Sequence, residues 1–279
     1  MDKNTARVKR KRLTGRLEAL DSLLVAFSGG VDSTFLLAVA HETMGEKVLA
    51  VTASSVIHPI RETENARGFA RKSGIAHVMI HPDELHIREF VSNTPERCYY
   101  CKKNLFTLLF EIAKENGIHH VAHGANMDDL KDHRPGFRAA TEMGVMAPLV
   151  DVEMGKEDIR FLSREMGLHT WDKSAMPCQA TRIPYGSKIT EKKLKMIEKA
   201  EAFLSKQGFG DVRVRHHGAM ARIEVGREDL NAMMDERLRK ATVKEFRKIG
   251  FAHIAVDLEG YISGKMNRGL NETLKGALD

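Results

Sequence analysis

The sequence predicts an α/β fold, in which a parallel sheet carries helices on both faces and a smaller C-terminal α/β domain follows. Short apolar runs of strand length alternate with helical stretches as far as residue 166, a pattern typical of parallel sheets. A polar, glycine-rich heptad also separates the first run, residues 23–27, from a buried helical run that begins at Phe35. We place the first domain at residues 1–175 and the second at residues 176–279.

Composition narrows the class of protein. The 279 residues are 42% hydrophobic and 29% charged, as in an ordinary globular chain. The formal net charge of +6 suits an anionic substrate or nucleic acid without choosing between them. Apolar stretches fall short of the roughly 20 residues of a membrane span, and the N-terminus has no apolar leader, so we expect a cytoplasmic protein without a membrane partner. Three cysteines in a reducing compartment favour metal binding or catalysis over disulfides.

The elements can be placed in order from their hydrophobic patterns. The opening helix ends before Ser22 and carries the basic residues 9–12, which we interpret as a solvated helix face rather than a nucleic-acid arm. The expected strands are residues 23–27, 47–52, 76–81, 118–123, 147–150, 212–215 and 221–225. The later helices are expected to begin at Phe35 and Thr94 and to span residues 62–72, 156–166 and 191–206.

The heptad of residues 28–34, Ser-Gly-Gly-Val-Asp-Ser-Thr, predicts a phosphate site. Backbone N–H groups at a helix N-terminus and the helix dipole favour an anion, and adjacent glycines let a phosphate approach the backbone. The chain has neither a Walker-type sequence nor a dinucleotide fingerprint. A Gly-Ser turn without a ligand is the alternative interpretation. The candidate phosphate ligands are Ser28, Gly29, Gly30, Asp32, Ser33 and Thr34.

This heptad resembles the pyrophosphate loop of the PP-loop ATP pyrophosphatases, whose pattern is Ser-Gly-Gly-x-Asp-Ser. The resemblance implies that ATP is cut between its α and β phosphates and that AMP is placed on a substrate oxygen. In open parallel sheets, ligands bind at the carboxyl ends of the strands. We therefore expect Val51 and Thr52, which end the second strand, to form the floor under the adenine.

An acidic turn follows the fourth strand and opens toward the same edge of the sheet. One or more of Asp128, Asp129 and Asp132 could hold Mg²⁺ on the pyrophosphate, since this cation takes carboxylate and phosphate oxygens. An Asp-rich turn that caps a helix is the alternative. With Gly124 and Asn126, Asp128 completes the expected nucleotide site.

Two of the cysteines lie at an expected helix start. Thr94 suits the N-cap and Pro95 the first helical position, so Cys98 and Cys101 fall on one face of the first turns. Thiolates at such places have lowered pKa values and are good ligands or nucleophiles. The pair could be half of a zinc site, a redox pair or part of an iron–sulfur site. Histidines at positions 119, 120 and 123 could complete a zinc site, which we do not favour.

The third cysteine, Cys178, lies in a proline-containing loop near Arg182. A buried structural cysteine is one interpretation. Because the thiol is in a loop beside a cation, we favour a nucleophile or a ligand.

Four motifs together resemble the LarE family over nearly the whole chain. They are the pyrophosphate loop, the turn of residues 124–136, the Cys-x-Ala-x-Arg-Ile-Pro-Tyr-Gly loop from Cys178, and Val-Arg-Val-Arg-His-His-Gly from Val212. The family comprises ATP-dependent sulfurtransferases that take part in the biosynthesis of the nickel-pincer nucleotide. This nucleotide is the cofactor of lactate racemase. The resemblance implies that ATP, with Mg²⁺, adenylates the carboxylates of pyridinium-3,5-biscarboxylic acid mononucleotide, and that a sulfur nucleophile then displaces AMP to leave thiocarboxylates. It also implies a homo-oligomer, with a hexamer among the candidates.

Two sulfur donors occur among proteins of this kind. In one variant, the loop cysteine, here Cys178, gives up its own sulfur and becomes dehydroalanine. In the other, three cysteines hold a four-iron four-sulfur cluster that carries an extra sulfide obtained from a sulfide source. The chain's only three cysteines, Cys98, Cys101 and Cys178, fall at the cluster positions, so we favour the second variant.

Alternation predicts that Arg213 and Arg215 face one side of a strand, and the same holds for Arg222 and Glu224 on the next run. A hairpin with a solvated polar face is the alternative. The resemblance implies that Arg213 and Arg215 bind the mononucleotide phosphate and that Arg182 and Glu224 belong to the substrate site. Near the C-terminus the chain departs from the family, because Ile262 stands where a Gly-Tyr-Arg pattern has arginine; Lys265 is the residue that could compensate.

Other functions would share some of these features. A transfer RNA thiolase would share the loop, the cysteines and the basic charge, but the chain has no basic patch interleaved with aromatic residues, so we expect no nucleic-acid partner. A non-catalytic nucleotide-binding module would leave the acidic turn and the thiols unexplained. An amide-forming ligase would need an ammonia source, and no glutaminase-like segment is visible.

Overall fold

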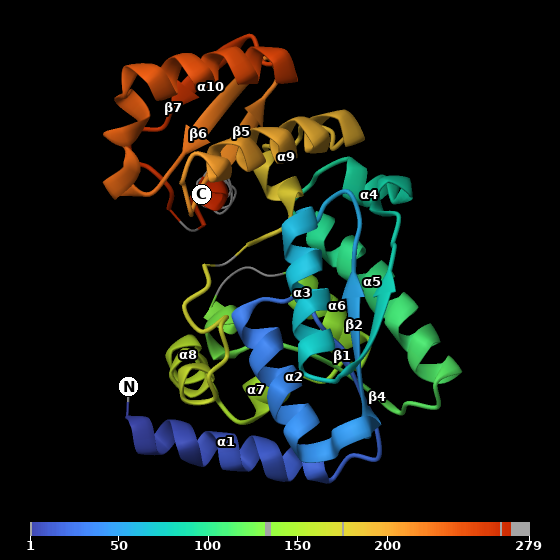
Figure 1. Ribbon diagram of the computed structural model, residues 1–279. Coiled ribbons are helices and arrows are strands. Elements are labelled where there is room, and N and C mark those ends of the chain that lie inside the picture. The colour runs from blue at the N-terminus through green and yellow to red at the C-terminus, as the bar shows by residue number, and fades with distance from the viewer. Residues whose placement is uncertain (1, 132–134, 175, 263, 269–279) are drawn as a thin grey trace, which may run out of the picture. The chain divides into compact units, whose positions relative to one another are not determined.

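The computed structural model describes residues 2–131, 135–174, 176–262 and 264–268 (Figure 1). Asp132, one of the expected Mg²⁺ ligands, lies outside the described residues. The chain forms two compact units, Met1–Met176 and Pro177–Asp279.

The first unit is built on a four-stranded parallel sheet in the order β3-β2-β1-β4. Its strands are β1 (Leu23–Ala26), β2 (Val48–Ala53), β3 (Ala76–Ile80) and β4 (His120–His123). In β1, Leu23 and Val25 pack into one core, whereas Leu24 packs into a second core on the other face. All three side chains are fully buried, so the central strand is covered on both faces, as expected for a parallel sheet.

Helices cover each face of this sheet (Figure 1). The helices of the unit are α1 (Lys3–Glu18), α2 (Val31–Met44), α3 (Ile60–Lys72), α4 (Arg88–Val91), α5 (Arg97–Glu115), α6 (Pro135–Glu142), α7 (Pro148–Asp151) and α8 (Lys156–Glu165). The core that contains Leu23 also takes apolar residues of α1, α2, α3 and α8, and the core that contains Leu24 takes those of α5 and α6. The predicted parallel α/β fold is confirmed.

Two local predictions were wrong. Residues 147–150 were expected to form a strand, but α7 begins at Pro148, and only Met146 makes an isolated parallel bridge with Ala122. Proline has no N–H for a strand ladder and suits the first position of a helix. The helix expected from Thr94 begins at Arg97 instead, after Asn93 has turned the chain with a φ of +57°. The two cysteines of α5 still fall in its first turns.

The second unit is a small α/β structure with its own core. Its three strands, in the order β5-β6-β7, are β5 (Arg213–His217), β6 (Met220–Glu224) and β7 (His253–Val256), and its helices are α9 (Glu191–Lys206) and α10 (Glu236–Ile249). β5 and β6 form an antiparallel hairpin whose turn begins at Gly218, with a φ of +65°, while β7 runs parallel to β6. Val214, Ile223 and Phe246 are fully buried in the core.

Among the described residues, no helix combines the length and the apolar character that crossing a membrane requires.

Candidate functional site

The phosphate loop connects β1 to α2 at the carboxyl edge of the sheet. Gly30 is the N-cap of α2 and has no side chain to satisfy the N–H groups of the first helical turn. Gly29 has a φ of +71°, a conformation that favours glycine, and a Cβ there would lie 3.1 Å from the Cβ of Ala66, so Ala66 would have to move slightly to admit it. The hydroxyls of Ser28 and Ser33 are 3.0 Å apart. This arrangement suits an anion at the helix N-terminus.

Thr34, predicted as a phosphate ligand, is fully buried. Its N–H donates to the carbonyl of Gly30 at 3.0 Å and so forms a bond within α2. Thr34 therefore lies beneath the loop rather than at its surface.

Asp32 in the loop contacts Lys156 of α8, with 2.5 Å between Oδ2 and Nζ. Burial raises the pKa of the Asp32 carboxyl above its ordinary value, although the Lys156 ammonium acts in the opposite direction. The charge of nearby Asp129 also raises this pKa. Two carboxyl groups and an ammonium are thus placed beside the phosphate loop.

A second lysine, Lys173, contacts the loop from the segment after α8. Its Nζ donates to the carbonyl of Gly29 at 2.9 Å and lies 2.6 Å from Oε2 of Glu62 on α3. Arg160 of α8 donates to the carbonyls of Trp171 and Lys173, at 2.8 Å each, and holds this segment. Sequence reasoning missed Lys156 and Lys173, because no local motif surrounds them and only the tertiary fold brings them to the loop.

The chain leaves β4 in close contact with the phosphate loop. A Cβ on Gly124 would lie 2.8 Å from the backbone nitrogen of Ser33, so only glycine permits this approach. Asn126 is buried, and its Oδ1 accepts from the N–H of Asp128 at 2.9 Å.

The acidic turn also caps the N-terminus of α8, which starts 28 residues further along the chain. Oδ2 of Asp128 accepts from the N–H of Lys156 at 2.7 Å and thereby caps α8, while Oδ2 of Asp129 accepts from the N–H of Asn126 at 3.0 Å. The turn therefore caps a helix, which was the alternative to a Mg²⁺ site in the sequence analysis. Its carboxylates and Asp32 are also the oxygen donors that Mg²⁺ prefers, so the donor chemistry fits this ion.

Val51 and Thr52 tie the end of β2 to the end of β1. Phe27 N–H donates to the Val51 carbonyl at 2.8 Å, and the Thr52 hydroxyl donates to the Phe27 carbonyl at 2.7 Å. Nε2 of His77 lies 2.8 Å from that hydroxyl, and burial lowers the pKa of His77. The side chain of Thr52 is thus used within the sheet, while the strand end lies beside the phosphate loop.

The structure brings two of the three cysteines together. Cys98 and Cys101 lie three residues apart at the start of α5, both half-buried, whereas Cys178 belongs to the second unit. None of the three is in a disulfide. Within the described ranges, no group of three or more His, Cys, Asp or Glu side chains is arranged to hold a metal ion.

Burial, together with the nearby charge of Lys102, lowers the pKa of His123 to about 4.

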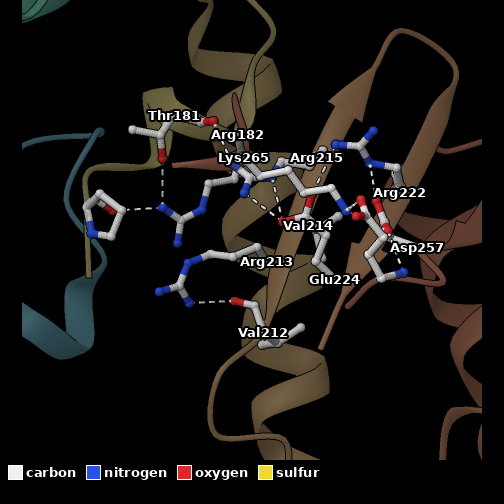
Figure 2. A network of polar contacts seen from close by, with 12 residues as sticks. Thr181, Arg182, Val212, Arg213, Val214, Arg215, Arg222, Glu224, Asp257 and Lys265 are labelled. Atoms are coloured by element: carbon white, nitrogen blue, oxygen red, sulfur yellow. Dashed lines mark hydrogen bonds and ion pairs between the residues drawn. The ribbon is translucent and has the colours of Figure 1, made fainter. Parts of the chain in front are cut away.

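In the second unit, Arg182 holds the loop that carries Cys178, and Figure 2 shows it beside Thr181 of the same loop. The guanidinium is fully buried, and it donates through Nε and Nη2 to the two carboxylate oxygens of Glu201, at 2.9 and 3.0 Å. Its Nη1 donates to the carbonyls of Pro177 at 2.8 Å and Cys178 at 3.3 Å. Arg182 is therefore committed to the protein itself.

The two arginines of β5 are also buried. Arg215 donates to Oε2 of Glu224 from Nε at 3.0 Å and from Nη2 at 2.6 Å, and to the carbonyl of Thr181 at 2.9 Å. Arg213 is 1% exposed; it donates to the carbonyl of Val212 at 2.9 Å and lies 4.6 Å from the centre of the Tyr261 ring. Burial lowers the pKa of Arg213, and the charge of Arg182 adds to this effect. Carboxylate and carbonyl groups of the protein thus accept hydrogen bonds from the two arginines to which the family resemblance assigned the substrate phosphate.

The sheet, the glycine loop at its carboxyl edge and the acidic turn define a PP-loop ATP-binding protein. A family model described as a PP-loop domain matches residues 3–132. The pyridinium-3,5-bisthiocarboxylic acid mononucleotide synthase of Lactiplantibacillus plantarum is 34% identical, over 96% of this chain and 97% of that protein. An uncharacterized protein of Synechocystis is 40% identical over 91% and 94% of the two chains, and one of Methanocaldococcus jannaschii is 31% identical over 86% and 91%.

The chain belongs to the LarE family, as its similarity to the Lactiplantibacillus protein over nearly its full length shows. It is an ATP-dependent sulfurtransferase.

Proposed function

We propose that this enzyme converts the two carboxylates of pyridinium-3,5-biscarboxylic acid mononucleotide into thiocarboxylates. The observation that carries the proposal is the match over 96% of the chain to a protein named as the synthase of the bisthiocarboxylic acid mononucleotide. The cytoplasmic location and the homo-oligomeric state remain predictions from the sequence.

In the first step, an oxygen of a substrate carboxylate attacks the α phosphorus of ATP. The bond from that phosphorus to the bridging oxygen breaks, and pyrophosphate leaves. The N-terminus of α2 stabilises the charge that develops on pyrophosphate. Lys156 can add its ammonium once it exchanges Asp32 for a phosphate oxygen. Mg²⁺ would be held by phosphate oxygens together with one or more of the carboxylates of Asp32, Asp128 and Asp129, and it would neutralise phosphate charge.

In the second step, a sulfur nucleophile attacks the acyl carbon, and AMP leaves with the electrons of the broken carbon–oxygen bond. Adenylation thus divides one difficult substitution into two easier steps. Each carboxylate consumes one ATP and one sulfide equivalent, and the products are AMP, pyrophosphate and a thiocarboxylate.

For the sulfur source, we propose a four-iron four-sulfur cluster held by Cys98, Cys101 and Cys178. The chain has only three cysteines, and two of them lie in the first turns of α5, where thiolates are stabilised. When bound, such a cluster supplies an iron without a protein ligand, to which sulfide can attach. The competing proposal is that Cys178 itself gives up its sulfur, and it leaves Cys98 and Cys101 without a role.

The first experiment measures iron and acid-labile sulfide in the wild-type protein and in Cys98→Ala, both purified without oxygen. We expect about four irons per chain in the wild type and their loss in the variant. If no iron binds even after anaerobic reconstitution, the cluster proposal is wrong, and mass spectrometry of Cys178 after turnover should then show loss of its sulfur.

The reaction is tested by incubating the anaerobic protein with ATP, Mg²⁺, sulfide and the biscarboxylic acid mononucleotide. We expect AMP, pyrophosphate and a product in which sulfur has replaced oxygen, which mass spectrometry resolves. Pyrophosphate release without any sulfur-containing product would contradict the proposed function.

A further inference from the structure

The peptide that joins Gly29 to Gly30 lies in the turn of the phosphate loop and can take two orientations. A flip of this peptide reverses its N–H and its carbonyl and moves the φ of Gly30 from −80° into the positive range, which glycine adopts about as readily. A Cβ at Gly30 would meet only the hydroxyl of Ser28, at 3.4 Å. The backbone of the loop therefore does not by itself fix the direction of the Gly30 N–H.

In the structure, the two polar groups of this peptide are bonded on opposite sides. The carbonyl of Gly29 accepts a hydrogen bond from Nζ of Lys173 at 2.9 Å. The N–H of Gly30 donates to the hydroxyl of Ser28 at 3.4 Å, which is long for a hydrogen bond. Because the N–H and the carbonyl of a trans peptide point in opposite directions, Lys173 holds the N–H on the side of Ser28. That long bond can be exchanged for a stronger one to a phosphate oxygen.

Lys173 is itself placed by two helices of the first unit. Its Nζ lies 2.6 Å from Oε2 of Glu62, in the first turn of α3. Nη2 of Arg160 on α8 donates to the carbonyl of Lys173 at 2.8 Å, and the N–H of Lys173 donates to the carbonyl of Thr170 at 3.0 Å. Protein groups thus fix both the backbone and the ammonium of this lysine.

The ion pair between Lys173 and Glu62 is not a strong source of stability. The two side chains are only 19% and 13% exposed, so both charges have lost most of their water. Replacing such a pair by apolar residues of similar size is often neutral or stabilising. Placement of the ammonium on the Gly29 carbonyl is therefore a better explanation of the pair than stability.

We infer that Lys173 is a positioning residue of the phosphate loop. Its ammonium fixes the peptide between Gly29 and Gly30, so that the N–H of Gly30 is directed toward the pyrophosphate part of ATP. Lys173 acts through the backbone and does not need to touch a phosphate. The inference concerns the loop alone and does not depend on the proposed pyridinium substrate.

The test is calorimetric titration of the full-length protein with pyrophosphate, ATP and AMP, each with Mg²⁺. In Lys173→Met, pyrophosphate and ATP should bind about tenfold or more weakly, as expected when a hydrogen bond to a charged group is lost. AMP has no pyrophosphate, so its affinity should stay near that of the wild type. A residue that only stabilised the fold would not separate these ligands. Lys173→Arg keeps cationic donors and should recover most of the affinity for pyrophosphate.

The matched control is Lys240→Met, which removes a lysine of α10 that pairs with Glu236 and is 73% exposed. It should bind all three ligands as the wild type does, because it lies in the second unit and contacts no part of the phosphate loop.

Glu62→Gln separates positioning from a long-range effect of charge. If Lys173 acted through its charge alone, removal of the neighbouring negative charge should tighten pyrophosphate binding about as much as Lys173→Met weakens it. If it acts through the peptide, the bond to Gly29 gains nothing from this change, and binding should be no tighter than in the wild type.

Thermal unfolding of each variant shows whether it is folded. If Lys173→Met does not fold, Lys173→Gln serves instead, because its amide stays polar beside Glu62 but ends one bond short of the lysine nitrogen, and it should weaken pyrophosphate binding likewise. The inference is overturned if the wild type does not bind pyrophosphate, if the Lys173 variants bind it unchanged, if AMP is weakened equally, or if Glu62→Gln tightens binding. None of these readouts involves thiocarboxylate formation, so failure of the proposed function would leave them unaffected.

Discussion

Asp32 shows how the phosphate loop places a charge where the fold does not favour it. Burial raises the pKa of its carboxyl even though Lys156 lies 2.5 Å away. The folded protein therefore prefers the protonated form more than the unfolded chain does. Such a group is retained for chemistry rather than for stability.

We therefore predict that Asp32→Asn raises the free energy of unfolding at pH 7. The gain should shrink as the pH falls through the raised pKa, because the native carboxyl then becomes neutral like the amide. Release of pyrophosphate from ATP should fall by about tenfold or more, since a carboxylate beside the phosphates is lost. Urea unfolding at pH 7 and pH 5 measures the first effect, and a variant less stable than the wild type at pH 7 would contradict it.

Two half-buried histidines, His58 and His123, make stability depend on pH in the opposite sense to Asp32, because they lower it in acid. Burial and the charge of Lys102 lower the pKa of both His58 and His123 to about 4. Between pH 6.5 and 4 these histidines are protonated in the unfolded chain but stay neutral in the folded protein. Stability should therefore fall with decreasing pH in this window, by up to about 1.4 kcal/mol per pH unit for each histidine.

The check on the histidines is the slope of unfolding free energy against pH. The slope should become shallower in His123→Gln, and a replacement at the exposed His253 should leave it unchanged. Equal slopes in the wild type and in His123→Gln would show that His123 does not carry the effect.

At the scale of the element, the approach of β4 to α2 depends on one missing side chain. A Cβ at Gly124 would lie 2.8 Å from the nitrogen and 2.9 Å from the Cα of Ser33. Because backbone atoms cannot move aside as a side chain can, Gly124→Ala should cost about 1–3 kcal/mol of stability. It should also weaken ATP binding, since the first turn of α2 shifts.

The matched control for Gly124→Ala is Gly68→Ala, in the middle of α3. A Cβ there would meet nothing within 4 Å, and alanine is the better helix former, so this variant should gain about 0.5–1 kcal/mol. Chemical denaturation of both variants and a titration with ATP make the comparison. Similar effects of the two substitutions would refute the argument from close approach.

At the scale of the whole molecule, each unit has its own hydrophobic core. In the second unit, Leu204, Val214, Ile223 and Phe246 are fully buried against one another. We expect the fragment 177–279 to fold when expressed alone and to unfold cooperatively on heating. Circular dichroism provides the measurement, and a broad transition without cooperativity would contradict the prediction.

The fold was predictable because its signals are local. The run of residues 23–27 has the length and apolarity of a buried strand, and the glycines that follow it mark the turn into α2. Pro148 could have indicated α7 in place of a strand, because proline favours a helix start. Residues 147–150 are otherwise apolar enough for either element.

The site was predictable only in part. Motifs indicated the loop and the acidic turn, but Lys156 and Lys173 reach the loop from distant segments without any pattern of their own. Alternation placed Arg213 and Arg215 on one side of a strand, yet it could not tell that carboxylate and carbonyl groups of the protein would surround Arg215. Such partners depend on tertiary packing, which the hydrophobic periodicity of the sequence does not predict.

The contacts of Arg182 have a consequence for the way the enzyme should be assayed. They hold the loop of Cys178 through its carbonyl groups and not through its sulfur. Under the competing proposal, in which Cys178 gives up its sulfur, a spent molecule should therefore keep these contacts and melt at nearly the same temperature as a competent one. Melting then does not separate the two states, so counting the sulfur at residue 178 is the measurement that distinguishes that proposal from the cluster.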